Sequence, residues 1–322
     1  MASPTTPDVL FCTDTFWDDV GERIVAIDPT IEVVRLIGDD QITQGDLDRI
    51  TISFVTPDAY PTRIHQFIGA TLRCPNLRWF QLAFAGTDSP AFQKLMERGV
   101  TLTNASGAAA TDIAQTVMMY LLALSRDLPR LARAQADRRW APEYFPSLHG
   151  KRLGIVGYGA IGAEVARLGD ALGMHPIGLR RTPRGDEGIE IWTNDRFHDL
   201  LGWADAIVVT APLTDETRNM FDADAFERMR EGAWFVNVGR GAVVDEAALI
   251  AALADGPLAG AGLDVFGTEP LPTDSILWEL PNVIITPHNS GDTELTDARA
   301  VEIIIENFRR HTVGEPLRNV VS

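Results

Sequence analysis

Short runs of β-branched and other apolar residues recur along the chain and are separated by polar segments compatible with helices. Runs of this kind, without polar alternation, are typical of parallel strands that are buried on both faces. In the first third of the chain they predict strands at 9–12, 31–37, 50–55, 79–84 and 100–103. From residue 151 onward they predict strands at 152–156, 175–179, 206–210, 233–237, 259–263 and 283–286, with a helix over 160–172. This alternation of strands and helices indicates doubly wound parallel sheets.

Two further helical patterns flank the second series of strands. One covers 108–124 and ends before Pro129, and the other covers about 293–311, where apolar residues share one face at helical spacing. The arginine-rich stretch 130–146 carries Trp140 and is predicted to be surface, loop or interface. A helix that follows a completed sheet can pack on either domain.

Length and charge narrow the possible functions. The 322 residues suggest two domains. There are 28 Lys and Arg residues against 45 Asp and Glu residues, which gives a net charge of −17. Such a protein repels phosphate backbones and anionic lipid, so we expect neither a nucleic-acid partner nor a membrane partner.

The cysteine and histidine content argues against a metal site. Cys12 and Cys74 lack metal-binding spacing, and the six histidines are scattered. The N-terminus lacks the features of a secretory signal, and no apolar run approaches the roughly 20 residues of a membrane span. We therefore expect a cytoplasmic protein without a bound metal.

A glycine-rich segment lies between the strand at 152–156 and the helix at 160–172. Its G-x-G-x-x-G spacing permits a tight turn, close approach of the backbone to a pyrophosphate and close helix–strand packing. The amides at the helix N-terminus then face negative charge. This context predicts dinucleotide binding, and a merely structural turn is the alternative. The candidate cofactor-binding residues here are Gly157, Tyr158, Gly159, Ala160, Ile161 and Gly162.

The end of the next strand decides which dinucleotide is preferred. NAD-binding chains carry an acidic residue about 20 positions further on, where it holds the ribose 2′-hydroxyl. Here Arg180 stands at that position and is followed by Arg181, Thr182 and Arg184. A guanidinium can hold a 2′-phosphate through two hydrogen bonds, whereas a carboxylate would repel it. We therefore predict that NADP(H) is preferred and NAD(H) possible; the alternative is a solvated basic loop.

Three further segments place polar residues directly after predicted strands. Arg240 follows the strand at 233–237, Glu269 follows the strand at 259–263, and His288 follows the last strand. Ligands of open α/β sheets bind beyond the carboxyl ends of the strands. There a histidine can protonate a developing alkoxide, a glutamate can orient it, and an arginine can clamp a carboxylate. Each residue alone could be a surface ion pair or a cap, but together they predict a hydride-transfer site.

Motifs along most of the chain resemble those of the D-isomer-specific 2-hydroxyacid dehydrogenases, the family that includes glyoxylate and hydroxypyruvate reductases. In family order and spacing they are GIVGYGAIG, TAPLTDETRNMF, FVNVGRGAVVDEAAL, GAGLDVFGTEPLP and NVIITPHNSG. The resemblance runs from about Asn76 to Leu317 and is weaker before it. It implies two doubly wound domains. A flavodoxin-like substrate domain would comprise 1–104 and 291–322, and a Rossmann dinucleotide-binding domain would comprise 105–290.

The same resemblance implies roles for individual residues. Arg240 would bind the carboxylate and carbonyl of a 2-keto acid, His288 would be the general acid/base, and Glu269 would be its partner. Asp264 would lie beside the nicotinamide carboxamide. The other implied cofactor-binding residues are Thr210, Ala211, Pro212, Val238, Gly239 and His288. The implied substrate residues, whose backbone amides would hold the carboxylate, are Phe84, Ala85 and Gly86.

The resemblance further implies a homodimer built through the dinucleotide-binding domain. The helix at 108–124 and the arm around Trp140 would form the contact, and Trp140 is a candidate for reaching the partner's active site. Residues near Asn104 and Ser290 would form a hinge, whose closure would exclude water from the hydride path. Arg180 departs from the acid common in NAD-using relatives, which agrees with the charge argument.

Residues and resemblance together predict an NADPH-preferring reductase of small 2-keto acids to D-2-hydroxy acids, reversible as a dehydrogenase. His288 would deliver a proton while hydride passes from the nicotinamide. A nucleotide-sensing binding protein of the same fold, without significant turnover, is the alternative from another class. A formate-type dehydrogenase is a further alternative within the enzyme class.

Overall fold

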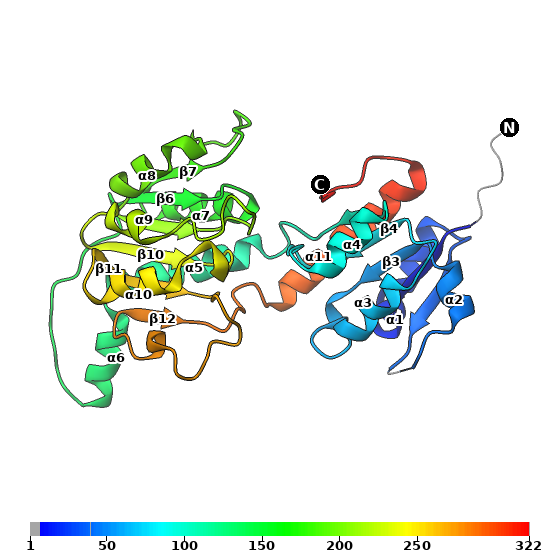
Figure 1. The fold of residues 1–322 in the computed structure, drawn as a ribbon, viewed down its shortest axis with the longest axis horizontal. Helices are drawn as coiled ribbons and strands as arrows, with labels where there is room; N and C mark the ends of the chain where they lie inside the picture. The colour runs from blue at the N-terminus through cyan, green and yellow to red at the C-terminus, as the bar shows by residue number, and fades with distance from the viewer. Residues whose placement is uncertain (1–6, 39, 322) are drawn as a thin grey trace. The chain divides into compact units, whose positions relative to one another are not determined.

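The computed structural model describes residues 7–38 and 40–321, which form two compact units (Figure 1). The first unit contains the chain up to Ala108 together with Thr293–Ser322, and the second unit is Ala109–Asp292. The C-terminal segment therefore returns to the unit in which the chain begins. Among the helices of the described residues, none is long and apolar enough to cross a membrane.

The first unit is built on a parallel five-stranded sheet in the order β2-β1-β3-β4-β5. Its strands are β1 (Val9–Thr13), β2 (Glu32–Leu36), β3 (Ile52–Val55), β4 (Trp79–Leu82) and β5 (Thr101–Thr103). This is the flavodoxin-like order, which reverses between β1 and β3. Its helices are α1 (Asp14–Ile27), α2 (Gln44–Arg49), η1 (Pro57–Ala59), α3 (Ile64–Leu72), α4 (Pro90–Glu97) and α11 (Glu294–Val313).

Aromatic side chains fill the core on both faces of this sheet. Phe11 of β1 stacks on Phe67 of α3 with 4.3 Å between ring centroids. Phe54 of β3 meets Phe308 of α11 edge to face at 6.1 Å, in a separate cluster that also holds the even-numbered residues of β1. The alternation of side chains along β1 therefore buries both faces, and α11 covers one of them.

The second unit is built on a parallel seven-stranded sheet in the order β12-β11-β10-β9-β6-β7-β8. Its strands are β6 (Arg152–Val156), β7 (His175–Leu179), β8 (Glu190–Trp192), β9 (Ala206–Val209), β10 (Ala233–Asn237), β11 (Leu258–Leu263) and β12 (Val283–Ile285). The order reverses between β6 and β9, as in Rossmann folds. Its helices are α5 (Ala110–Ser125), α6 (Leu128–Ala136), α7 (Ala160–Ala171), η2 (Asn194–Arg196), α8 (Phe197–Trp203), α9 (Ala223–Glu227), η3 (Gly241–Val243), α10 (Glu246–Ala254) and η4 (Ile276–Trp278).

The two parallel sheets confirm the fold class predicted from the sequence. The expected strands are present, three of them with the expected bounds and the others with one or both ends shifted by one or two residues. Such shifts arise because terminal strand residues do not differ in pattern from the loops beside them. Among the strands and α-helices, β8 and α6 were not predicted. The three-residue strand β8 is too short to show a pattern, and α6 occupies the start of the stretch expected to be surface or loop. Pro129 stands in the first turn of α6, where its missing N–H costs nothing.

Candidate active site

The carboxyl ends of the seven strands of the second unit lie along one edge of its sheet, because all the strands are parallel. The glycine loop follows β6 there, and the candidate residues Thr210, Arg240, Asp264 and His288 follow β9, β10, β11 and β12. Residues that are far apart in the sequence therefore converge at the edge where open α/β sheets bind ligands.

The glycine loop turns sharply between β6 and α7. Gly157 has φ +96°, and a Cβ atom there would lie 2.5 Å from the backbone of Ala211. The Thr210 hydroxyl donates to the Gly157 carbonyl at 2.7 Å and joins the loop to the segment after β9. Apart from its chain neighbours, no described atom lies within 4 Å of the Cβ position of Gly159, and α7 begins at the next residue. The loop thus leaves space for an anion before the helix N-terminus.

The arginine cluster predicted to bind a 2′-phosphate lies at the end of β7. The Arg180 guanidinium is 3.7 Å from the Glu187 carboxylate, and the Arg181 guanidinium is 3.8 Å from that of Glu216. The Arg180 side chain is 23% exposed, whereas that of Arg181 is 77% exposed. The arginines were predicted from the sequence, but the contact with Glu187 was not, because nothing in a glycine-rich turn predicts which acidic side chain folds back on which arginine.

His288 and Glu269 are in direct contact. The imidazole Nδ1 lies 2.6 Å from Glu269 Oε2, and Oε1 of the same carboxylate accepts the backbone N–H of Phe266 at 2.9 Å. A carboxylate beside Nδ1 orients the imidazole ring. The His288 side chain is 49% exposed, so Nε2 is the ring nitrogen that can exchange a proton with a ligand.

The loop that carries His288 is held by the buried carboxylate of Asp264. One oxygen accepts hydrogen bonds from the Thr286 hydroxyl and the Asn289 N–H, and the other accepts from the N–H and hydroxyl of Ser290. His288 itself has φ +53°, a left-handed conformation that costs energy for a residue with a Cβ atom. Because Asp264 binds residues on both sides of it, this one carboxylate holds the turn in place.

Tyr120 of α5 supports the same loop. Its ring is buried, and its hydroxyl is hydrogen-bonded to the hydroxyl of Thr286. Burial raises the pKa of Tyr120 far above its ordinary value, so the phenol stays protonated and can donate. The support that Tyr120, Thr286 and Ser290 give to the His288 loop was not predicted from the sequence, where Ser290 was expected only near a hinge. Hydroxyl side chains two residues before and after His288 were the available signal.

Arg240 lies in the turn after β10. The side-chain amide of Asn237 donates to the Arg240 carbonyl at 3.1 Å, and its oxygen accepts the Gly239 N–H at 3.0 Å. A Cβ atom on Gly241 would lie 1.9 Å from the backbone of Phe266, so only glycine allows this approach. The half-buried Arg240 guanidinium donates to the Gly239 carbonyl at 2.8 Å. The turn with the arginine is thus in backbone contact with the segment that leads to the candidate glutamate.

The predicted substrate residues belong to the first unit, whereas the three predicted catalytic residues belong to the second. Phe84, Ala85 and Gly86 follow β4, and the Phe84 side chain is partly exposed. The Phe84 carbonyl accepts the Ala105 N–H at 3.2 Å, and the Asn104 side-chain amide donates to the Ala85 carbonyl at 2.9 Å. These bonds order the loop, and its role toward a substrate stays a prediction.

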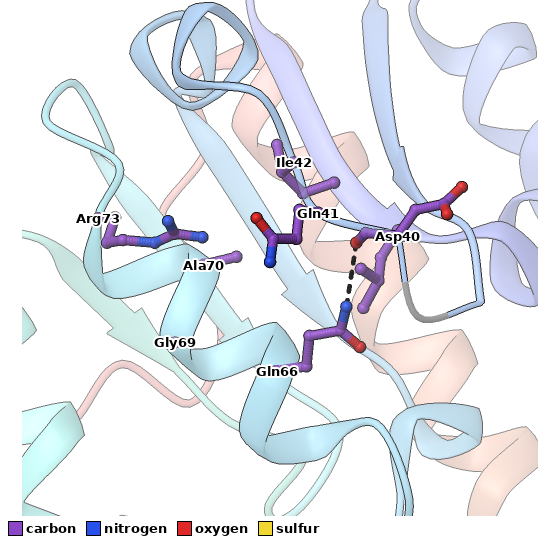
Figure 2. Close-up of a pocket in the computed structure, with 8 residues that line it drawn as sticks. Asp40, Gln41, Ile42, Gln66, Gly69, Ala70 and Arg73 are labelled. Atoms are coloured by element: carbon purple, nitrogen blue, oxygen red, sulfur yellow. Dashed lines mark hydrogen bonds between the residues drawn. The ribbon is translucent and has the colours of Figure 1, made fainter.

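A separate pocket of the first unit lies between the segment after β2 and helix α3 (Figure 2). Polar side chains from both segments line it, and Gln66 donates to the backbone carbonyl of Asp40 at 3.0 Å. No residue predicted for catalysis or binding lines this pocket. Within residues 7–38 and 40–321, no group of three or more histidine, cysteine or acidic side chains could hold a metal ion.

Comparison of the chain with known proteins identifies a family. The NAD-binding domain of the D-isomer-specific 2-hydroxyacid dehydrogenases matches residues 118–290. Glyoxylate/hydroxypyruvate reductase B of Escherichia fergusonii is 36% identical over 261 residues, which covers 78% of this chain and 79% of that protein.

Two solved structures match almost the whole chain. A D-isomer-specific 2-hydroxyacid dehydrogenase from Xanthobacter autotrophicus Py2, in complex with NADPH and MES, is 32% identical with a TM-score of 0.81 and coverage of 99% and 98%. The NADPH-dependent glyoxylate/hydroxypyruvate reductase from Sinorhizobium meliloti, in complex with NADP and sulfate, is 29% identical with a TM-score of 0.80 and coverage of 98% of both chains.

A Rossmann-type sheet of this order, matched by an NAD-binding family along more than half of the chain, defines an NAD(P)-dependent oxidoreductase. More narrowly, the family match and a relative that is 36% identical over 78% of the chain show that this chain belongs to the D-isomer-specific 2-hydroxyacid dehydrogenase family. The resemblance identified from the sequence motifs is thereby confirmed.

Proposed function

We propose that the protein reduces small 2-keto acids to D-2-hydroxy acids with NADPH as the preferred cofactor, and that it catalyses the reverse reaction as a dehydrogenase. The observation that carries this proposal is the 2.6 Å contact between His288 and Glu269 at the sheet edge that also bears the glycine loop. An imidazole oriented by a carboxylate is suited to general acid/base catalysis beside a bound dinucleotide. The D stereochemistry rests on membership of the family.

In this proposal each of the three candidate catalytic residues has a separate role in the reduction. A reduced nicotinamide, when bound, supplies the hydride. Arg240 binds the substrate carboxylate through charge-assisted hydrogen bonds and polarises the neighbouring keto group. His288 donates its Nε2 proton to the keto oxygen as negative charge develops there. Glu269 holds the imidazole ring through Nδ1, so that Nε2 stays free to face the keto oxygen.

The residues of the second unit fit a dinucleotide. The open space at Gly159 before α7 suits a pyrophosphate, and Arg180, Arg181 and Thr182 after β7 suit a 2′-phosphate. We assign the nicotinamide side of the site to Thr210, Ala211, Pro212, Val238, Gly239, Asp264 and His288. The two solved relatives that contain NADPH or NADP support the preference for NADP(H).

The substrate assignment rests on the relatives and on the first unit. The E. fergusonii and S. meliloti proteins are glyoxylate/hydroxypyruvate reductases, which supports a small 2-keto acid as the substrate. We assign carboxylate binding to the backbone amides of Phe84, Ala85 and Gly86. In this proposal the first unit is the substrate domain and the second unit is the dinucleotide-binding domain.

We further propose that the protein is a homodimer formed through the second unit. Met119 and Leu122 are exposed on one face of α5, and Leu128 is exposed at the start of α6. Trp140 and Tyr144, in the arm that follows, are almost fully exposed. Apolar side chains gathered on neighbouring segments indicate a surface that a partner covers. Light scattering on the purified protein should give twice the chain mass of 35.2 kDa, and a monomer would contradict this part.

Absorbance of the reduced nicotinamide tests the reaction class. NADPH and NADH are each combined with glyoxylate, hydroxypyruvate, pyruvate, phenylpyruvate and branched 2-keto acids. We expect oxidation of NADPH with at least one of the small acids and slower oxidation of NADH. Absence of turnover across the panel, with tight NADP(H) binding still measurable, would favour the nucleotide-sensing alternative.

A further inference from the structure

The loop after β7 folds around an acidic side chain. The side chain of Glu187 is only 6% exposed, although the residue lies in a surface turn. Its Oε2 accepts the backbone N–H of Gly185 at 2.8 Å, and its Oε1 accepts the backbone N–H of Arg184. Oε1 also lies 3.7 Å from the guanidinium of Arg180. The carboxylate therefore rests against an arginine that the proposed function assigns to the cofactor's 2′-phosphate.

This carboxylate is ionised at neutral pH but is not tightly bound to Arg180. The N–H groups of Arg184 and Gly185, together with the Arg180 guanidinium, hold the pKa of Glu187 below its ordinary value. A separation of 3.7 Å is longer than a hydrogen bond, so the contact with Arg180 is an ion pair without a directional bond. An anion that offers such bonds to the guanidinium can take the place of the carboxylate.

The Glu187 turn is also connected to the glycine loop. The Tyr158 hydroxyl donates to the backbone carbonyl of Glu187 at 3.1 Å. A Cβ atom on Gly178 would lie 2.6 Å from the Tyr158 ring, so the ring packs on β7 at a residue that has no side chain. The glycine loop, β7 and the Glu187 turn thus form one set of contacts, at the strand end where a dinucleotide-binding sheet recognises the adenosine ribose.

We propose that Glu187 is an internal competitor of the 2′-phosphate and sets the ratio between NADPH and NADH affinity. This inference rests on the proposed dinucleotide function. A 2′-phosphate takes two hydrogen bonds from a guanidinium and carries more negative charge than a carboxylate, so it displaces Glu187 from Arg180. NADH has no such group and leaves the ion pair in place. Displacing Glu187 therefore offsets part of the favourable interaction between the 2′-phosphate and Arg180. As a result, the arginines favour NADPH over NADH less strongly than they would without Glu187.

The substitution Glu187→Gln tests this directly, because it removes the charge and keeps a carbonyl oxygen for one backbone N–H. Dissociation constants of NADPH and NADH are measured by fluorescence titration of the wild type and the variant. We expect the Kd of NADPH to fall about tenfold, since loss of a like charge next to the phosphate is worth about one unit of log affinity. The Kd of NADH should change by less than about twofold, since NADH has no group that competes with the carboxylate.

Two further variants and a second pair of ligands separate competition from general charge effects. Glu190 lies nearby on β8 and accepts the indole N–H of Trp192 at 2.6 Å, so Glu190→Gln removes an equal charge without touching Arg180. We expect this variant to leave the ratio of the NADPH and NADH dissociation constants within about twofold of the wild-type ratio, because solvent screens the interaction between an exposed Glu190 carboxylate and the 2′-phosphate.

In an Arg180→Gln background, Glu187→Gln should no longer tighten NADPH binding. Adenosine 2′,5′-bisphosphate should gain affinity in Glu187→Gln as NADPH does, and AMP should not.

The outcomes distinguish this inference from the proposed function. If the wild type binds both nucleotides and Glu187→Gln leaves their affinity ratio unchanged or weakens NADPH, then Glu187 is not a competitor and the inference is wrong. Equal weakening of both nucleotides would also overturn it, because Glu187 would then only order the loop. If the wild type binds neither nucleotide, the proposed function fails and the inference fails with it.

Discussion

The carboxyl edges of the two parallel sheets both carry polar clusters, but their charges are satisfied in different ways. In the first unit, Arg63 donates to Asp14 at 2.6 Å and to Asp58 at 2.7 Å, and Asp58 also accepts from the buried Thr56 hydroxyl at 2.7 Å. The Arg63 side chain is only 15% exposed. In the second unit, the imidazole of His288 meets a single carboxylate and stays half exposed.

This difference distinguishes charged clusters that stabilise the fold from charged groups that can take part in catalysis. A charge network with partners on several sides orders the chain around it and offers little to a ligand. A titratable group that one partner orients, and that solvent still reaches, can exchange a proton with a substrate. Because one strand architecture supports both arrangements, a position at a carboxyl edge does not by itself identify an active site.

Replacing His288 with alanine has the largest expected effect. Loss of the general acid/base group should lower kcat by roughly two to four orders of magnitude in the NADPH oxidation assay. The free energy of unfolding should change by less than about 0.5 kcal/mol, because the side chain is half exposed. His198→Ala is the matched control, since His198 is exposed on α8 and should keep wild-type turnover. Near-normal activity of the His288 variant would remove this residue from the acid/base role.

Asp264→Asn should act on catalysis through the position of His288. One of the two oxygens that accept hydrogen bonds from the loop becomes an NH2 group, so the strained turn loses the hydrogen bonds that this oxygen accepts. We expect kcat to fall about ten- to hundredfold, the size of effect that misplacement of a catalytic group produces. The Kd of NADPH should stay within about twofold of the wild-type value if positioning is the only role. A parallel rise in that Kd would instead support the direct nicotinamide contact implied by the family resemblance.

Arg63→Ala tests the closed cluster of the first unit. The half-buried carboxylates of Asp14 and Asp58 lose their shared cation, so the free energy of unfolding should fall by about 2 kcal/mol in a urea titration. Arg35→Ala is the comparison: its pair with Asp18 at 3.3 Å is well exposed, and its loss should cost less than about 0.5 kcal/mol. Equal effects of the two substitutions would show that burial does not distinguish the clusters.

The sequence was most informative where burial imposes a pattern. Most strands of the two sheets are buried on both faces, so their residues form mainly apolar runs that can be located without a structure. That Glu269 and His288 lie close together could also be predicted, because the two residues follow the adjacent parallel strands β11 and β12. By contrast, the edge strand β8 has only three residues, which are too few to show the hydrophobic pattern of a strand.

The parts that could not be predicted depend on where a side chain turns within a loop. Asp264 stands far from Thr286 and Ser290 in the sequence, and only the paired strand ends bring its carboxylate to both. Glu187 reaches Arg180 because the N–H groups of the turn between them bind its carboxylate. Apolar periodicity carries no information about such contacts, which depend on local hydrogen bonds.

A third polar cluster, at the opposite end of the first sheet, connects the two ends of the chain. Asp8, just before β1, lies 2.9 Å from Nε2 of His311 in the last turn of α11, and it accepts the Thr51 hydroxyl at 2.7 Å. Arg78 forms an ion pair with the same carboxylate. Burial raises the pKa of Asp8, but the bonds from His311 and Thr51 and the charge of Arg78 outweigh it and lower the pKa to about 2.

Asp8→Asn should have the smallest effect, and that effect should depend on pH. The folded-state pKa of about 2 lies below the ordinary value of 3.8, so the ionised carboxylate stabilises the fold above pH 3.8 and loses this contribution as pH falls toward 2. We expect the variant to be less stable by about 1–2 kcal/mol at neutral pH and the difference to shrink across this acidic window. Urea titrations of both proteins at several pH values measure it. A difference that stays constant down to pH 2 would mean that lost packing, and not the charge of Asp8, accounts for the destabilisation.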